Sequence, residues 1–160
     1  MAVRIPLVVN SGEIQQLQSG DSINVPYSGA VEITQTNANS GSIVIGQAVY
    51  SSSADNVNLA EANASGTSKV IGLVATTSIS TTSTGQIAVD GILSATTGQW
   101  DAIAGTTGGL TFGTNYYLSP STAGSLTSTA PSTTGQYIVL IGIAISTTEL
   151  RLNIQPRILL

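Results

Sequence analysis

Short runs of β-branched and other apolar residues recur along almost the whole chain, separated by Gly, Ser, Thr, Asn and Pro. The clearest runs are residues 43–50, 70–75, 86–93 and 137–145. Branched side chains are restricted at χ1 and favour a pleated sheet over a helix. Many short strands with frequent turn signals are typical of a sandwich or a barrel. We therefore expect an all-β fold, an antiparallel β-sandwich or β-barrel, in which only residues 100–104 form a helical turn.

The start of the chain differs from the rest. Pro6 interrupts a short apolar run and suits an edge or an arm better than a central strand. Residues 22–26 alternate polar and apolar side chains, as a half-buried strand does. We expect an extended N-terminal arm over residues 1–26 that buries its apolar residues against the same chain or a neighbour. Residues 27–160 are then a single β domain that ends in a short apolar C-terminal tail.

Two parts of the chain resemble each other. Gly46–Ser51 is similar to Gly113–Leu118, and Val70–Ala75 is similar to Leu140–Ile145. Each copy has a short strand, a Ser/Thr/Gly loop, an apolar strand with a central glycine and a final alternating strand. We expect each central glycine to mark a bulge or a close backbone approach. A true repeat predicts two similar strand groups, packed face to face or closing one barrel together, and a chance likeness in a low-complexity background is the alternative.

The chain contains no Cys and no His. It therefore lacks thiol nucleophiles, imidazole bases and the commonest ligands of zinc and copper. The single lysine, Lys69, is expected to be a solvated residue at a strand entry rather than the base of a Ser–Lys dyad. The eight carboxylates show no spacing that suggests a catalytic pair: Glu13, Asp21, Glu32, Asp55, Glu61, Asp90, Asp101 and Glu149. We expect no enzymatic activity, no cofactor and no metal site.

Charged residues make up only 8% of the chain, and the net charge is −4. Four basic residues are too few for a phosphate-binding patch, so we expect no nucleic-acid partner. No stretch approaches the roughly eighteen apolar residues of a membrane span, and the N-terminus does not read as a signal peptide. A neutral, hydroxyl-rich surface suits a permanent place in an assembly, because little charge repulsion opposes association.

A series of landmarks spans residues 110–146: Gly113, Tyr117-Leu118, Gly124, Leu126-Thr127, Pro131 and Gly142. This pattern resembles a module of tailed-bacteriophage virion proteins, which occurs in head-decoration (cement) proteins, head fibres and tail-fibre or baseplate proteins. The resemblance covers residues 40–155 well and the first forty loosely. It implies a compact β domain, usually trimeric, that locks onto a capsid or a fibre, and its motifs are structural rather than catalytic.

The first functional hypothesis is a head-decoration protein, made in the host cytoplasm and placed on the outer surface of the phage head. It would form a homotrimer and stabilise the capsid through many contacts with the major capsid protein. The residues expected at the assembly interface lie in the arm and the tail: Ile5, Leu7, Val8, Val9, Ile14, Leu17, Pro156, Ile158, Leu159 and Leu160.

The alternative hypothesis is a tail-fibre or baseplate module that contacts a host receptor or a glycan. Such a module would need exposed aromatic rings, and Trp100 and Tyr116 are the first candidates. A lone Trp beside a loop more often caps a core or fills an interface. The exposure of Trp100 therefore bears directly on this alternative.

Overall fold

The computed structural model describes residues 7–10, 13–16 and 29–160, the first two of these ranges as backbone only. β1 (Leu7–Asn10) and β2 (Glu13–Gln16) form an antiparallel hairpin. The elements that follow are β3 (Ala30–Asn37), β4 (Ile43–Val44), β5 (Ala48–Ser53), β6 (Asn56–Leu59), β7 (Val70–Val74), β8 (Ser78–Ile79), β9 (Thr84–Ser94), α1 (Thr97–Ala104), β10 (Asn115–Leu118), β11 (Leu126–Thr127), β12 (Tyr137–Ile138), β13 (Leu140–Ala144), β14 (Glu149–Leu152) and β15 (Ile158–Leu159). The all-β expectation is confirmed, and so is the helical turn around Trp100.

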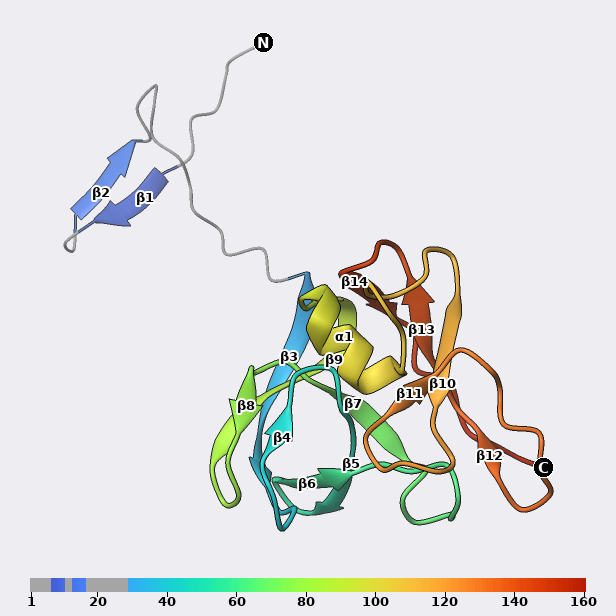
Figure 1. Ribbon diagram of the computed structural model, residues 1–160. Helices are drawn as coiled ribbons and strands as arrows, with labels where there is room; N and C mark the ends of the chain where they lie inside the picture. Colours follow the sequence, from blue (N-terminus) through green and yellow to red (C-terminus); the bar gives the residue numbers. More distant parts are fainter. Residues whose placement is uncertain (1–6, 11–12, 17–28) are drawn as a thin grey trace.

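Five strands close into a barrel in the order β9-β3-β6-β5-β7, and β7 pairs back to β9 (Figure 1). Every pair is antiparallel except β3 and β6, which run parallel where Thr36 and Asn37 face Asn56 and Val57. The expectation of a purely antiparallel fold is therefore wrong at this pair. An odd number of strands cannot close with all neighbours antiparallel, so one parallel pair is required. The barrel core consists of Ile43, Val49, Val57, Val74, Ile79 and Ile87.

β9 leaves the barrel at Gly91 and joins the second strand group. Its last four residues, 91–94, pair with residues 149–152 of β14. Gly91 has φ +90°, and a methyl group added there would lie 2.1 Å from the carbonyl oxygen of Gly29. Only glycine fits both the backbone conformation and the space, so this residue lets one strand serve both groups.

The two similar sequence segments adopt the same strand pairing. β5 pairs antiparallel with β7, and β10 pairs antiparallel with β13. The register is the same in both, and it shifts after the second pair in both. The matched pairs are Ala48–Leu73, Val49–Gly72 and Tyr50–Val70 in the first group, and Asn115–Ile143, Tyr116–Gly142 and Tyr117–Leu140 in the second.

Further contacts repeat between the groups. The strand orders are β6-β5-β7-β9 and β11-β10-β13-β14. The amide of Gly46 donates to the carbonyl of Val74 at 2.9 Å, and the amide of Gly113 donates to the carbonyl of Ala144 at 2.8 Å. The sequence likeness therefore marks a structural repeat rather than a chance similarity.

The two groups are joined edge to edge through β9 and β14 (Figure 1), and only the first group closes the barrel, together with β3. The expectation of one barrel closed by both groups is thus wrong. Helix α1 explains why the second group does not close a barrel. In the repeat, α1 occupies the position that β3 occupies in the first group, because the separation in sequence from α1 to Gly113 equals that from β3 to Gly46. β3 is rich in β-branched residues, whereas α1 begins with a capping box between Thr96 and Gln99. The second group therefore has a helix where the first has its closing strand.

The inner face of the second group covers the outside of the barrel. The main core cluster combines small and large residues from both: Ala48, Leu73 and Ala88 from the barrel, and Tyr116, Leu118, Ala144 and Leu150 from the second group. Positions equivalent to Ala48 and Ala88 carry Asn115 and Arg151 in the second group, and both are exposed. The two groups thus share their strand pairing but differ at two positions of one face, which are apolar in the first group and polar in the second.

Candidate assembly surfaces

The C-terminal tail is a strand whose backbone is held and whose side chains are exposed. β15 pairs antiparallel with β12, with Ile158 opposite Ile138 and Leu159 opposite Tyr137. The amide of Leu160 donates to the carbonyl of Gln136 at 3.0 Å. The exposed fractions of Ile158, Leu159 and Leu160 are 61%, 60% and 37%. The structure therefore exposes these three predicted interface residues next to one another at the end of the chain, and we call them the tail surface. Because successive side chains of a strand point to opposite faces, Ile158 and Leu159 project from opposite sides of the β12–β15 pair.

Arg157 anchors the tail to the domain. Its guanidinium lies over the ring of Tyr137, 5.3 Å from the centroid, in the range of a cation–π contact. It also donates to the hydroxyl of Ser68 at 3.2 Å and to the carbonyl of Ser65. Pro156, the other predicted tail residue, is exposed just before this anchor. These contacts hold Arg157, directly before β15, against the domain.

The predicted interface residues of the arm are only partly described. Leu7, Val8 and Val9 lie in β1, and Val9 pairs with Ile14 in β2. Ile5 and Leu17 lie outside the described residues, as does the predicted strand at 22–26. The contribution of these residues to an interface stays a prediction.

Neither aromatic residue named for glycan contact is exposed. Trp100 is fully buried, and its indole N–H donates to the carbonyl of Thr148 at 2.9 Å. Tyr116 is also fully buried, and its hydroxyl accepts a hydrogen bond from the amide of Thr111 at 3.0 Å. Both rings are core residues with satisfied polar atoms, so they cannot stack on a sugar.

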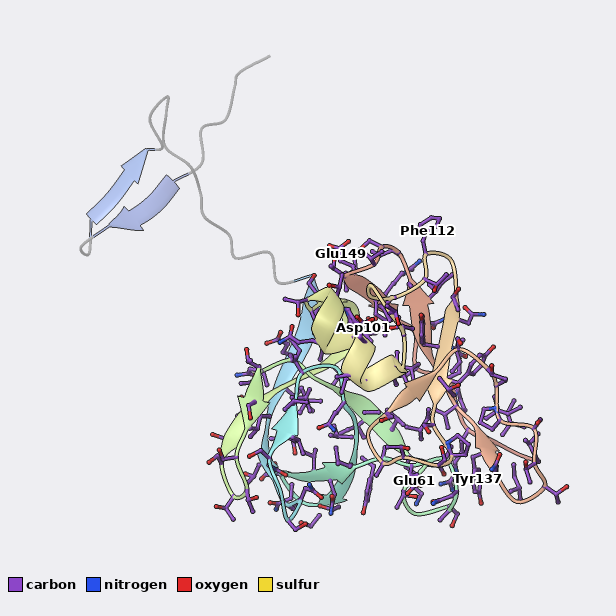
Figure 2. All side chains as sticks on the ribbon, viewed as in Figure 1. Glu61, Asp101, Phe112, Tyr137 and Glu149 are labelled. Carbon is purple, nitrogen blue, oxygen red and sulfur yellow. The ribbon has the colours of Figure 1, made fainter. Side chains whose placement is uncertain are left out.

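Phe112 is an exposed aromatic residue that the sequence analysis did not single out. Its side chain is 76% exposed, and Figure 2 shows it at the rim of the molecule. It precedes Gly113, whose φ of +77° marks a turn. The sequence signal that could have indicated its exposure is the position of a bulky residue directly before a turn glycine.

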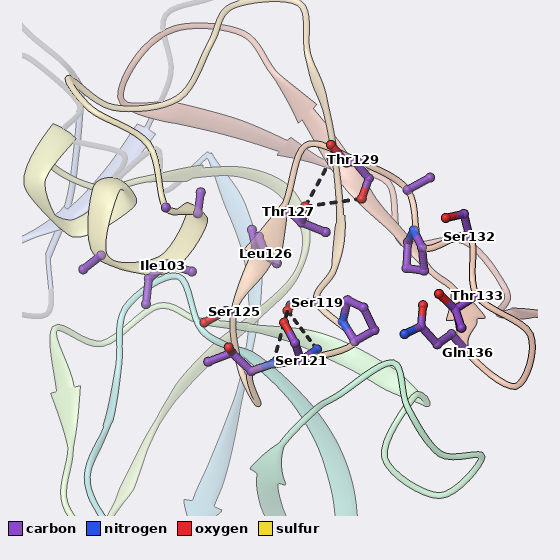
Figure 3. Close-up of a pocket in the computed structure, with 17 residues that line it drawn as sticks. Ile103, Ser119, Ser121, Ser125, Leu126, Thr127, Thr129, Ser132, Thr133 and Gln136 are labelled. Carbon is purple, nitrogen blue, oxygen red and sulfur yellow. Dashed lines mark hydrogen bonds between the residues drawn. The ribbon is translucent and has the colours of Figure 1, made fainter.

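A neutral groove lies between the C-terminal end of α1, β11 and the loops at 119–122 and 129–133 (Figure 3). Its volume is about 630 Å³, and no Asp, Glu, Lys or Arg lines it. The hydroxyl of Ser119 accepts hydrogen bonds from the amides of Ser121 and Thr122, each at 3.3 Å. The groove therefore offers hydroxyl groups that already support its own loops, and it offers no acid–base pair.

Asp101 is the carboxylate with the most contacts in the described chain, and its partners are local. It accepts hydrogen bonds from the amides of Gly109 and Gly108 at 2.8 and 3.0 Å and from the hydroxyl of Thr106 at 2.9 Å. The Gly109 amide is the main cause of a lowered pKa at Asp101. This network holds the loop after α1 and faces no second carboxylate, so we assign it a structural role.

No group of three or more carboxylates that could hold a metal ion occurs within residues 29–160. Lys69 is exposed, as expected for a strand-entry residue. Among the described residues, no helix is long and apolar enough to cross a membrane. The chain matches no protein-family model and none of the curated proteins with which it was compared.

Proposed function

We propose that this chain is a non-enzymatic structural protein of a tailed-phage virion that decorates the outer surface of the head. In this role it stabilises the capsid through multivalent contacts with the major capsid protein, as a homotrimer. The landmark residues that resemble the virion module support the proposal, because several of them are glycines that a turn or a close strand contact requires. Gly113 and Gly124 have φ values of +77° and +78°, and Gly142 permits a close strand approach.

The observation that carries the proposal is the tail surface. Three consecutive apolar side chains are exposed on a backbone that β12 and Arg157 hold in place. Grouped exposed apolar residues commonly mark a protein contact. A Leu or Ile side chain that becomes fully buried contributes about 1.5–3 kcal/mol, and several copies of the chain on one capsid would add their contacts through avidity.

The experiment is sedimentation of the purified protein with empty capsids that lack it. We expect saturable binding by the unmodified chain and a loss of at least about tenfold in apparent affinity for Leu159→Asp, because a charge would be buried against the partner. Val44→Asp is the matched control, since Val44 is also exposed but lies on β4. Equal binding of both variants and the unmodified chain would contradict the proposal. Binding to host cell envelopes but not to capsids would favour the tail-fibre alternative.

A further inference from the structure

The dipeptide Asp90-Gly91 lies where β9 passes from the barrel to the second strand group. Asp90 is exposed, and its Oδ1 atom accepts a hydrogen bond from the backbone amide of Gly91 at 2.7 Å. Because Oδ1 is bonded directly to Cγ, this contact also places the Gly91 nitrogen close to the carboxyl carbon of Asp90. The two atoms that would join to close a five-membered ring are therefore already neighbours, as in a near-attack arrangement.

The backbone at this dipeptide departs from a regular strand. The pairing of β9 with β3 steps from Ala88 directly to Asp90, so Val89 is an extra residue in β9, as in a β-bulge. Gly91 follows with φ +90°, a conformation that residues with a side chain rarely adopt. Gly91 also has no side chain that would shield its nitrogen. The contact between the amide and the carboxylate thus lies in an irregular and sterically open part of the strand.

We infer that Asp90 and Gly91 form a site of spontaneous covalent modification, at which the folded chain converts aspartate to isoaspartate. In the first step the Gly91 nitrogen attacks Cγ of the neutral Asp90 carboxyl group. A bond forms between the nitrogen and Cγ, a Cγ–O bond breaks, and the hydroxyl group leaves with the amide proton as water. The product is a succinimide ring.

Hydrolysis of the ring completes the conversion. Water adds to one of the two ring carbonyls and breaks the bond between that carbon and the Gly91 nitrogen, which takes up a proton. Attack at Cγ restores Asp90, whereas attack at the main-chain carbonyl leaves the peptide bond on Cγ, which is isoaspartate. Both steps use only the chain and water, and the inference does not depend on the proposed virion function.

The other aspartates within residues 29–160 provide internal comparisons. Asp55 is exposed at a turn, with φ +57°, but Asn56 follows it. Asp101 is followed by Ala102, and the loop after α1 binds its carboxylate through two amides and a hydroxyl. A side chain on the following residue hinders ring closure. Asp90 therefore combines exposure, a following glycine and a direct contact with the reacting nitrogen.

The modification would disturb the join between the two strand groups. In isoaspartate the main chain passes through Cγ, so β9 would gain one backbone carbon atom directly before Gly91. The space there is already filled, because the amide of Ile92 donates to the carbonyl of Gly29, and a methyl group at Gly91 would lie 2.1 Å from the same oxygen. Residues 91–94 also pair with β14 in a defined register. We therefore expect the isoaspartate form to melt at a lower temperature than the unmodified chain.

Incubation of the folded protein in mildly acidic buffer, followed by peptide mapping, tests the site. Isoaspartate has the same mass as aspartate, so enzymatic methylation of isoaspartyl carboxylates marks the product. We expect it to accumulate at Asp90 at least about tenfold faster than at Asp55 in the same sample, because only Asp90 contacts an unshielded nitrogen. Equal rates at the two positions would overturn the inference. So would isoaspartate that forms at Asp90 only in the urea-unfolded chain, because the fold would then prevent ring closure.

Two variants at Asp90 test the ring chemistry itself. Asp90→Asn keeps the Oδ1 acceptor and closes the same ring with loss of ammonia. We expect it to form isoaspartate at least about tenfold faster at neutral pH, because an amide needs no added proton to reach its neutral form. Asp90→Glu is the matched control, since its longer side chain would need a six-membered ring and should stay unmodified. An Asp90→Asn variant that stays unmodified would overturn the inference.

Discussion

The indole N–H of Trp100 donates a hydrogen bond to the carbonyl oxygen of Thr148 at 2.9 Å. This bond joins α1 to the residue directly before β14, and so links the helix to the second strand group. The ring also lies against Gly46 of the first group, where an added methyl would lie 3.1 Å from it. Trp100 is therefore a structural link between the two halves of the repeat.

Replacement of Trp100 should separate the contribution of the hydrogen bond from that of packing. Trp100→Phe keeps an aromatic ring but loses the N–H donor. We expect it to lower the free energy of unfolding by about 0.5–1.5 kcal/mol, as the loss of one hydrogen bond does, because the Thr148 carbonyl still accepts from the amide of Ala95 at 2.9 Å. Trp100→Ala should cost about 3–5 kcal/mol. Urea unfolding followed by circular dichroism measures both values. Two variants as stable as the unmodified chain would contradict this role.

The central glycines of the repeat should be intolerant of a side chain. A methyl group at Gly142 would lie 2.2 Å from the carbonyl oxygen of Arg151, and one at Gly72 would lie 2.4 Å from that of Ala88. We expect Gly142→Ala and Gly72→Ala each to destabilise the fold by about 1–3 kcal/mol or more, as overpacking does. Gly66→Ala is the control, because nothing lies within 4 Å of its added methyl. Thermal unfolding measures the three stabilities. Equal melting temperatures for all three variants would show that the close approach at the central glycines does not matter.

The stability of the fold should depend on the charge of Asp101. Its pKa is lowered from 3.8 mainly by the Gly109 amide, so the folded state favours the ionised carboxylate. The stabilisation is therefore complete above the unfolded pKa and is lost as the pH falls through the folded pKa. We expect Asp101→Asn to be less stable than the unmodified chain at neutral pH, with a difference that shrinks once the pH falls below 3.8. A difference that does not change over this pH range would count against the hydrogen-bond network.

Arg157 should control the order of the tail without controlling the barrel. Arg157→Ala removes the contacts with Tyr137, Ser65 and Ser68. We expect faster proteolysis of the last residues and a change of about 0.5–2 kcal/mol in the free energy of unfolding, as for the loss of a cation–π contact. Limited proteolysis with mass spectrometry measures the first effect. A tail equally resistant in both proteins would show that the β12–β15 pairing suffices to hold it.

Local patterns in the sequence predicted much of this fold. The β-branched runs predicted the strands, and the likeness between Val70–Ala75 and Leu140–Ile145 predicted the repeat with its glycines. The sequence did not predict how the two strand groups join. The join depends on Gly91, where β9 approaches Gly29 and begins to pair with β14, and both contacts involve residues far apart in the sequence. The parallel contact between β3 and β6 likewise follows from closure of the barrel, which no local pattern encodes.

The assembly surfaces were predicted in part. The apolar tail was visible in the sequence, but its anchor through Arg157 and Tyr137 joins residues that only the fold brings together. Trp100 and Tyr116, the residues of the glycan alternative, lie in the core because both groups of the repeat pack around them.

The most direct test of the proposed function is a cryo-electron microscopy reconstruction of virions of the tailed phage that, under this proposal, encodes the chain. The account predicts density for the barrel on the outer surface of the head, at three-fold or quasi-three-fold positions. Ile158, Leu159 and Leu160 should lie against the major capsid protein. A head without this density, with the chain found only in the tail or absent from the virion, would contradict the account.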